Sequence, residues 1–100
     1  MLPFTALPPA QRFLKKIVEK PLKKAFLEAI TEIRLDPSIG SMKTGDLSGI
    51  MGYDVHYKGI NYEIAYRLEE NDDGELVVII LAGSRENFYE ELKRYMKKGS

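Results

Sequence analysis

The apolar residues of this chain change their spacing near Leu47, and that change decides what the chain can fold into. Between residues 21 and 36 they recur about every 3.6 residues, which predicts a helix that begins at Pro21 and ends at Asp36-Pro37. Its inner face consists of Leu22, Ala25, Phe26, Ala29, Ile30 and Ile33. Beyond Leu47 apolar and polar side chains alternate, as in strands with one buried face. Helices are therefore expected first, and a sheet after them.

The segments near the two ends of the chain extend this pattern. Residues 3–7 suit a short edge strand, which a pair of prolines ends because proline cannot donate to a ladder. A first helix is expected from residue 9 to about residue 18, and a last helix from residue 86 to residue 98. The inner stripe of the last helix consists of Phe88, Leu92, Tyr95 and Met96.

Three segments carry the strand pattern. Residues 53–58 and residues 62–67 alternate between apolar and polar side chains. Residues 76–82 are nearly all apolar, so they are expected to form a central strand that is covered on both faces.

The short connection between the first two strands decides which side chains face one another. We expect a tight two-residue turn at Gly59-Ile60. This turn places His56 directly opposite Glu63 on one face of the sheet. An imidazole and a carboxylate are thus expected to share one polar surface.

The order of the elements predicts an α+β fold: an N-terminal helical hairpin packed on a twisted antiparallel sheet of three to four strands, with a C-terminal helix. With the helices on one face, the other face stays partly open for a partner or a substrate. The length of 100 residues suits one domain that spans residues 1–100.

Composition excludes several classes of function. Fifteen basic and fifteen acidic residues balance, which argues against a protein that coats nucleic acid nonspecifically. Cysteine is absent, so disulfides and thiolate metal sites are excluded. We expect no metal and no cofactor, because no ligand cluster is visible in the sequence. Neither a membrane span nor a signal peptide is apparent, and a cytoplasmic location is expected.

Three motifs follow one another in a specific order. Residues 43–49 read Lys-Thr-Gly-Asp-Leu-Ser-Gly, residues 62–67 read Tyr-Glu-Ile-Ala-Tyr-Arg, and residues 83–89 have the form Gly-x-Arg-x-x-x-Tyr. Together with the order of helices and strands, this pattern resembles the RelE/ParE superfamily of bacterial toxin–antitoxin modules. The resemblance covers essentially the whole chain.

The resemblance implies a toxin that a cognate antitoxin protein holds silent. In the RelE branch such toxins cut messenger RNA in the ribosomal A site, which inhibits translation. In the ParE branch a similar fold poisons DNA gyrase without nuclease chemistry. Our leading hypothesis is a metal-independent, ribosome-dependent mRNA endoribonuclease. The alternatives are a gyrase inhibitor and a protein with the toxin fold that has lost activity.

The resemblance also assigns roles to three side chains. Arg85 lies where RelE-type toxins place a phosphate-binding arginine, and Tyr89 lies where they often carry a catalytic tyrosine. Arg67 ends its strand on the polar face and is a candidate to stabilise charge on the phosphoryl group. The simpler alternatives are a solvated Arg85, a Tyr89 that only packs, and an Arg67 that pairs with a surface glutamate.

Four further residues are candidates. His56, Glu63 or Tyr89 would move the protons of the reaction. His56 suits this role because imidazole titrates near neutral pH, although a lone surface histidine usually has no functional role. Lys43 and Lys58 are candidate RNA-binding residues, although either lysine can equally be an ordinary solvated side chain.

The sequence departs from the nuclease pattern at two positions. RelE-like nucleases commonly carry arginine where this chain has Glu63, and often histidine or lysine where it has Ser84. Either Glu63 acts as a base with His56 and Arg67 around it, or the chain is not a nuclease. The nuclease hypothesis requires that Arg85, Tyr89 and His56 gather around one space of the size of an anion.

Overall fold

The computed structural model of the chain describes residues 1–97 and contains one mixed five-stranded sheet, in the order β1-β5-β4-β3-β2. Its strands are β1 (Phe4–Ala6), β2 (Ser41–Met42), β3 (Met51–Tyr57), β4 (Ile60–Asn71) and β5 (Gly74–Ser84). Its helices are α1 (Pro8–Lys16), α2 (Lys20–Leu35) and α3 (Phe88–Lys97), with short 3₁₀ turns η1 (Pro37–Ile39) and η2 (Gly45–Leu47). The predicted α+β class is confirmed. The sheet differs from the prediction in its five strands and in β1, which pairs with β5 in parallel.

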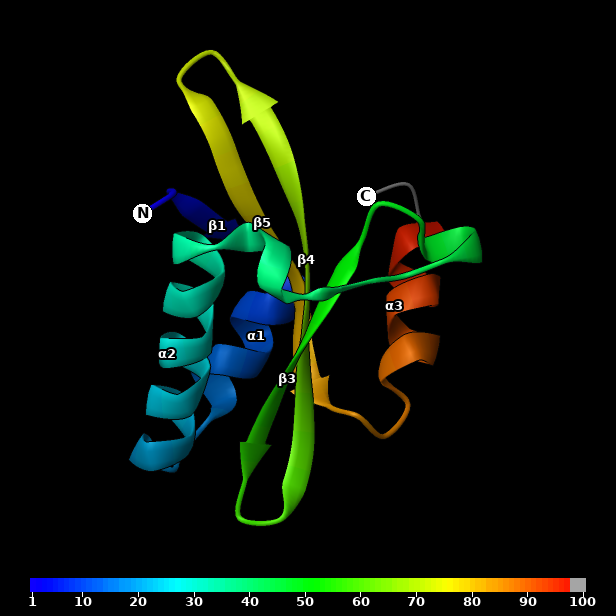
Figure 1. Cartoon of the computed structure of the whole chain (residues 1–100). Coiled ribbons are helices and arrows are strands. Elements are labelled where there is room, and N and C mark those ends of the chain that lie inside the picture. The colour runs from blue at the N-terminus through cyan, green and yellow to red at the C-terminus, as the bar shows by residue number, and fades with distance from the viewer. Residues whose placement is uncertain (98–100) are drawn as a thin grey trace.

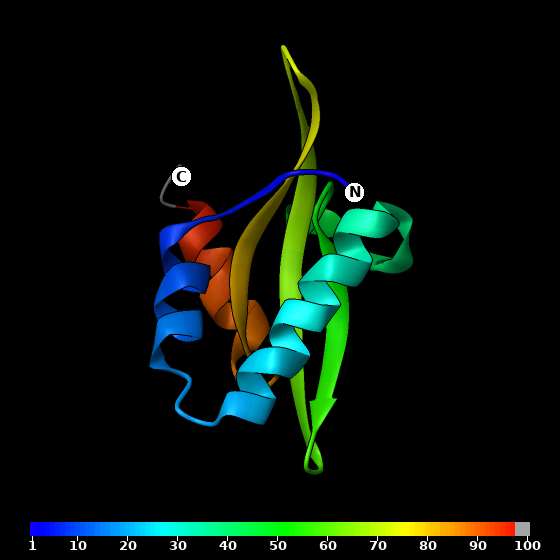
Figure 2. The same ribbon diagram turned by 90° about the vertical axis from the view of Figure 1, so that its left-hand side faces the viewer.

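The sheet is covered on both faces rather than on one. Helices α1 and α2 lie against one face, and α3 lies against the other, as Figures 1 and 2 show. The first core contains Phe26, Ile30, Ile33, Val55, Ile64 and Tyr66, and the second contains Leu47, Ile50, Ala65, Ile80, Phe88 and Leu92. The expectation that all helices share a face was therefore wrong, whereas the prediction of a central strand buried on both faces holds for β5.

The turn between β3 and β4 lies one residue earlier than predicted. Lys58 and Gly59 form it, both with positive φ (49° and 77°), as a type I′ hairpin turn requires. His56 consequently lies opposite Asn61, and Glu63 lies opposite Asp54. The expected pairing of His56 with Glu63 was wrong, because moving a two-residue turn by one position shifts the register by two.

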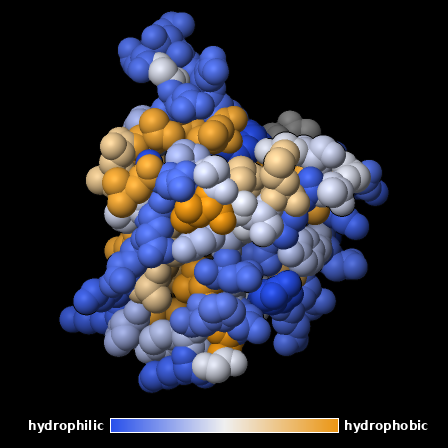
Figure 3. Space-filling view, viewed as in Figure 1, coloured by the Kyte–Doolittle hydropathy of each residue, from blue (hydrophilic) through white to orange (hydrophobic). Residues whose placement is uncertain are grey.

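The hairpin of β4 and β5 extends well beyond the body of the molecule (Figure 1). Its two-residue tip lies between Asn71 and Gly74. The acidic residues of this end are Glu69, Glu70, Asp72, Asp73 and Glu75. Hydrophilic atoms cover the protruding end in Figure 3.

A loop from α2 to β3 crosses the edge of the sheet, where a buried tyrosine holds it. The Tyr66 hydroxyl donates to the carbonyl of Pro37 at 2.7 Å and accepts from the amide of Gly40 at 3.0 Å. A Cβ on Gly40 would lie only 2.5 Å from that hydroxyl, so glycine is required for this close approach. The loop then forms β2 and delivers Lys43 onto the face of the sheet that α3 covers.

Helix α3 begins later than the sequence suggested. Asn87, with φ of 60°, separates it from β5, and the helix starts at Phe88 rather than at Glu86. Lys98, the predicted end, lies outside the described residues. The predicted inner stripe is confirmed, with Phe88 and Leu92 buried and Tyr95 and Met96 partly buried. Within residues 1–97, no helix combines the length and the apolar composition needed to cross a membrane.

Candidate functional site

A cavity of about 340 Å³ opens on the sheet face that carries α3, beside the first turn of that helix. Its charged and phenolic lining comes from five different parts of the chain. Lys43 follows β2, Tyr53 and Asp54 lie in β3, Glu63 in β4, Arg85 just after β5, and Tyr89 in the first turn of α3.

The charged and phenolic side chains of this cavity gather around Glu63, which lies in its wall. Its side chain is only 1% exposed, which is unusual for a carboxylate. The Lys43 ammonium lies 2.9 Å from one carboxylate oxygen, and the Tyr89 hydroxyl lies 3.1 and 3.2 Å from the two oxygens. The Nε of Arg85 lies 3.6 Å from the other oxygen. The charge of Glu63 is thus compensated, as burial of a carboxylate demands.

Lys43 and Tyr89 also contact each other. The Lys43 Nζ donates to the Tyr89 hydroxyl at 2.6 Å and lies 4.5 Å from the centre of its ring. Burial alone would lower the pKa of Lys43, but hydrogen bonds to Tyr89 and Glu63 and the charge of Glu63 outweigh it. The pKa of Lys43 is raised above its usual value, so this lysine is a cation at neutral pH.

Gly52 makes room for the pair of Lys43 and Glu63. A Cβ at this position would lie 2.3 Å from a carboxylate oxygen of Glu63 and 2.8 Å from the Nζ of Lys43. A glycine inside a strand weakens it and often marks a place where another group approaches closely. Here the approaching groups are the two charged side chains.

Arg85 stands at the rim of the cavity. Its backbone amide donates to the carbonyl of Asn61 at 3.0 Å, which fixes the start of the β5–α3 connection against β4. Its side chain is 46% exposed and reaches Glu63 through Nε. This contact with Glu63 uses only Nε, and the side chain is about half exposed, so the guanidinium is accessible to a ligand from the cavity.

Three of the residues singled out from the sequence lie elsewhere. His56 is exposed, and its Nδ1 contacts the Oδ1 of Asn61 at 2.5 Å. Arg67 lies four residues beyond Glu63 along β4, about 13 Å away, and pairs with Glu69 at 2.6 Å. Lys58 lies in the hairpin turn. Of the three groups expected around one space, the structure brings together Arg85 and Tyr89 but not His56.

Asp54 and Lys43 lie at positions in the cavity that the sequence did not predict. Asp54 lines the cavity directly opposite Glu63, and the correct turn position would have found it. Lys43 was expected to face RNA from the surface, whereas it pairs with a buried carboxylate. No local signal in the sequence reveals that pairing, apart from the glycine at position 52.

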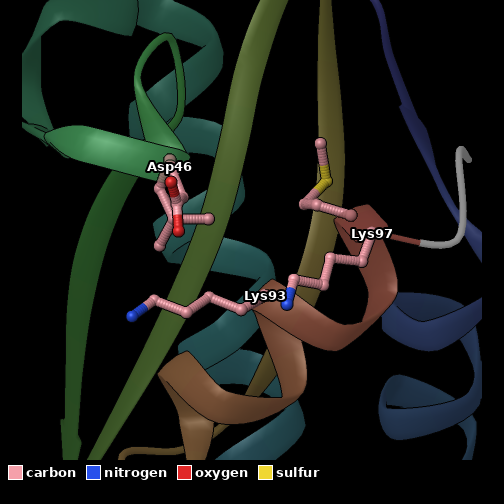
Figure 4. A pocket seen from close by; sticks show the side chains of 5 residues that line it. Asp46, Lys93 and Lys97 are labelled. Carbon is pink, nitrogen blue, oxygen red and sulfur yellow. The ribbon is translucent and has the colours of Figure 1, made fainter.

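A second hollow of about 270 Å³ lies farther along α3. It is lined by Leu47, Met96 and three charged residues, Asp46, Lys93 and Lys97. In Figure 4 the two lysines project from α3 and Asp46 from the turn η2. The hollow carries no titratable group that is buried, in contrast to the cavity around Glu63.

A model of the ParE-like toxins of type II bacterial toxin–antitoxin systems matches residues 4–93. The chain belongs to this family. The match includes all six lining residues of the cavity that carry a charge or a phenol. Comparison with curated protein sequences gave no significant match.

Solved structures of related toxins share the fold of this ParE-like toxin. The RelBE2 toxin–antitoxin complex of Mycobacterium tuberculosis has a chain that is 23% identical, with a TM-score of 0.63, covering 84% of this chain and 98% of that one. The YoeB/ParE toxin of Agrobacterium tumefaciens is 10% identical, with a TM-score of 0.67 and coverages of 84% and 99%. A doubly substituted RelE toxin of E. coli in the free state is 17% identical, with a TM-score of 0.66 and coverages of 93% and 96%. At these identities the similarity concerns the fold.

Proposed function

We propose that this ParE-like toxin is a metal-independent endoribonuclease that cuts messenger RNA on the ribosome and so inhibits translation in the cytoplasm. The observation that carries the proposal is the buried Glu63, held by Tyr89 and Lys43 at the wall of an open cavity. A buried ion pair is a poor device for stability, since apolar packing of the same volume often stabilises as much or more. A buried charged cluster that opens to a cavity is therefore a candidate for chemistry.

The residues of the cavity fit cleavage by the RNA 2′-hydroxyl. In that reaction the 2′-oxygen bonds to the adjacent phosphorus, and the bond from phosphorus to the 5′-oxygen breaks. The products are a 2′,3′-cyclic phosphate and a 5′-hydroxyl. Arg85 at the rim offers donors to the non-bridging phosphate oxygens, whose charge rises in the transition state.

We assign to Tyr89, which lines the cavity together with Arg85, the protonation of the leaving 5′-oxygen. When the phenol gives up its proton, the tyrosinate that forms faces the Lys43 ammonium at 2.6 Å. Glu63 holds the phenol and the ammonium in this arrangement, because both of its oxygens contact the Tyr89 hydroxyl. Such general acid catalysis contributes about 10²- to 10⁴-fold in rate.

The ribosome supplies what the cavity lacks. The site contains few donors, and correct orientation of a reacting group is itself worth several kcal/mol of the barrier. A messenger RNA held on the ribosome meets this need. The structure of the RelBE2 complex shows that a toxin of this fold assembles with an antitoxin; we propose that a cognate antitoxin likewise holds this chain silent by covering the cavity face.

The test is to map new 5′ ends of messenger RNA after induction of the wild-type chain and of two arginine variants. Arg85→Ala is expected to reduce cleavage about 10²- to 10³-fold, the usual effect of removing one transition-state donor. Arg67→Ala is the matched control, because Arg67 also pairs with a glutamate but lies outside the cavity. Absence of cuts by the wild type, or undiminished cuts by Arg85→Ala, would contradict the proposal.

A gyrase-binding toxin without chemistry is the second candidate, and the charge of the cavity favours it. Lys43 and Arg85 contribute +2, and Asp54 and Glu63 contribute −2, so the lining has a formal net charge of zero. Such a lining exerts no net attraction on a phosphate. Inhibition of DNA supercoiling by the purified chain, without messenger RNA cuts in cells, would support this candidate instead.

A further inference from the structure

The proposed cleavage needs a group that accepts the proton of the attacking 2′-hydroxyl. Four candidates in or near the cavity are the carboxylates of Asp54 and Glu63, the amine of Lys43 and the imidazole of His56. They differ in what already occupies their acceptor atoms, and that difference selects one of them.

Three candidates are occupied, charged or outside the cavity. Glu63 is buried, and each of its oxygens already contacts the Tyr89 hydroxyl and one cation. Lys43 is a cation with a raised pKa, so its amine has no lone pair to offer at neutral pH. His56 lies two residues beyond Asp54 along β3, where it contacts Asn61 of β4, and it does not line the cavity.

Asp54 differs from them on each point. It lines the cavity and is exposed, and within residues 1–97 no hydrogen bond or ion pair occupies its carboxylate. Its cross-strand neighbour is Glu63, so two carboxylates lie opposite each other on one face. Like charges in this arrangement are destabilising, and both cations of the cavity pair with Glu63.

Asp54 thus weakens the sheet and has no partner that would offset this cost. Its presence is therefore better explained by a role in function than by a role in folding. Directly opposite residues in a strand pair have Cβ atoms about 5 Å apart. Asp54 and Arg85 line the same hollow of about 340 Å³, so a ribose and its phosphate bound in it would lie between them.

We infer that Asp54 is the catalytic base of the reaction, an inference that rests on the proposed nuclease function. Its carboxylate takes the proton of the 2′-hydroxyl while the 2′-oxygen bonds to phosphorus. At the same time the bond to the 5′-oxygen breaks, and that oxygen takes the proton of Tyr89. One proton enters Asp54 and one leaves Tyr89, so the charges and atoms balance without another reactant.

The experiment measures single-turnover cleavage of messenger RNA on programmed ribosomes by the purified toxin. Asp54→Asn is expected to slow cleavage about 10²- to 10⁴-fold, the usual contribution of a general base. Ribosome binding and thermal stability are expected to stay at the wild-type level or to rise, since the substitution removes a repulsive charge. Asp72→Asn, at the exposed hairpin tip, is the matched control and should cut normally.

A second variant gives a readout that a structural role would not produce. Asp54→His places a base with a reference pKa of about 6.5 at the same position. Its cleavage rate is expected to rise with pH between about pH 6 and pH 8, as the introduced imidazole loses its proton. The histidine variant should therefore recover part of the rate at the upper end of this range.

The outcomes separate the inference from the function on which it rests. If the wild type cuts and Asp54→Asn cuts at the same rate, the assignment of the base is wrong and the nuclease function stands. If the wild type makes no cuts on ribosomes, the proposed function fails and the inference fails with it. Loss of cleavage in Asp54→Asn together with a pH-independent Asp54→His would also overturn the assignment.

Discussion

A hydrogen bond between a tyrosine and a glutamate occurs on both faces of the sheet, in very different surroundings. On the α2 face, Tyr53 donates to Glu32 at 2.6 Å, and both carboxylate and bond are exposed to water. On the α3 face, Tyr89 donates to Glu63 at 3.1 Å, and the carboxylate is 1% exposed. The first bond ties a strand to a helix, whereas the second belongs to a charged cluster in a cavity.

The surroundings of the two hydrogen bonds, rather than the bonds themselves, indicate which one belongs to a functional site. The side-chain pair itself carries little, since the same two residue types are used for a surface contact. Burial, a cation within hydrogen-bond distance and an open cavity distinguish the Glu63 pair, and they make it dependent on its neighbours. The α2-face pair has no such dependence, because water can replace either partner.

The largest expected effect follows from removing the cation. Lys43→Met leaves Glu63 buried without its closest counter-charge, and we expect the free energy of unfolding to fall by about 3–5 kcal/mol. Lys58→Met is the matched control, because Lys58 pairs with Glu19 at 3.7 Å in an exposed position. Urea denaturation should show a clear loss for the first variant and no measurable change for the second.

A double variant shows whether the loss comes from the stranded carboxylate. Lys43→Met combined with Glu63→Leu replaces the pair by apolar groups, which is often neutral for buried ion pairs. Recovery of most of the lost stability is expected. A double variant as unstable as Lys43→Met alone would show that packing at position 43, rather than charge, carries the effect.

Much of the fold could be predicted from the sequence, because the spacing of apolar residues alone identifies long helices and strands. The apolar spacing located α2 and the inner stripe of α3, and the run of apolar residues predicted the burial of β5 on both faces. The position of α3 on the opposite face was not accessible, since an amphipathic helix indicates that it packs but not on which surface.

The charged cavity was less accessible, for reasons that lie in individual residues. Lys58 adopts positive φ without any side-chain preference that announces it, so the turn was placed one residue late and Asp54 was overlooked. Lys43 reaches Glu63 only because β2 brings its loop alongside β3. Arg85 and Tyr89 were found because they match the Gly-x-Arg-x-x-x-Tyr motif that carries the family resemblance.

The next effect in size concerns the space that the cluster needs. Gly52→Ala adds a methyl group 2.3 Å from an oxygen of Glu63, and overpacking of this kind destabilises by about 1–3 kcal/mol. Gly83→Ala is the matched control, since it also lies in a strand beside Glu63 and its new Cβ would meet only Phe88 at 4.0 Å. Replacing that strand glycine is expected to be neutral or to stabilise by up to about 1 kcal/mol.

Thermal unfolding of both variants measures the difference in stability, and a messenger RNA cleavage assay measures the difference in activity. Gly52→Ala is expected to displace Lys43 from Glu63 and to weaken cleavage, whereas Gly83→Ala keeps both. Equal stability and equal activity of the two variants would mean that the cluster adjusts freely, against the close contacts that the structure shows.

The smallest effect tests the α2-face pair by titration. The hydrogen bond to Glu32, together with partial burial, raises the pKa of Tyr53 to about 12. The pKa of a tyrosine in the unfolded chain is about 10, so the folded state holds the phenolic proton of Tyr53 more tightly than the unfolded state does. The stability that the bond contributes is thus fully present below about pH 10 and is lost as the pH rises through about 12.

Tyrosinate absorbance during alkaline titration measures this step. Tyr53→Phe should remove one phenol from the step at about 12, and Glu32→Gln should move that phenol toward the ordinary tyrosine range because the charged acceptor is gone. Tyr57→Phe, which loses a similar surface bond to Glu19, is the control and should leave the step in place. An unchanged step in Glu32→Gln would show that burial alone protects Tyr53, and the two faces would then differ less than their hydrogen bonds indicate.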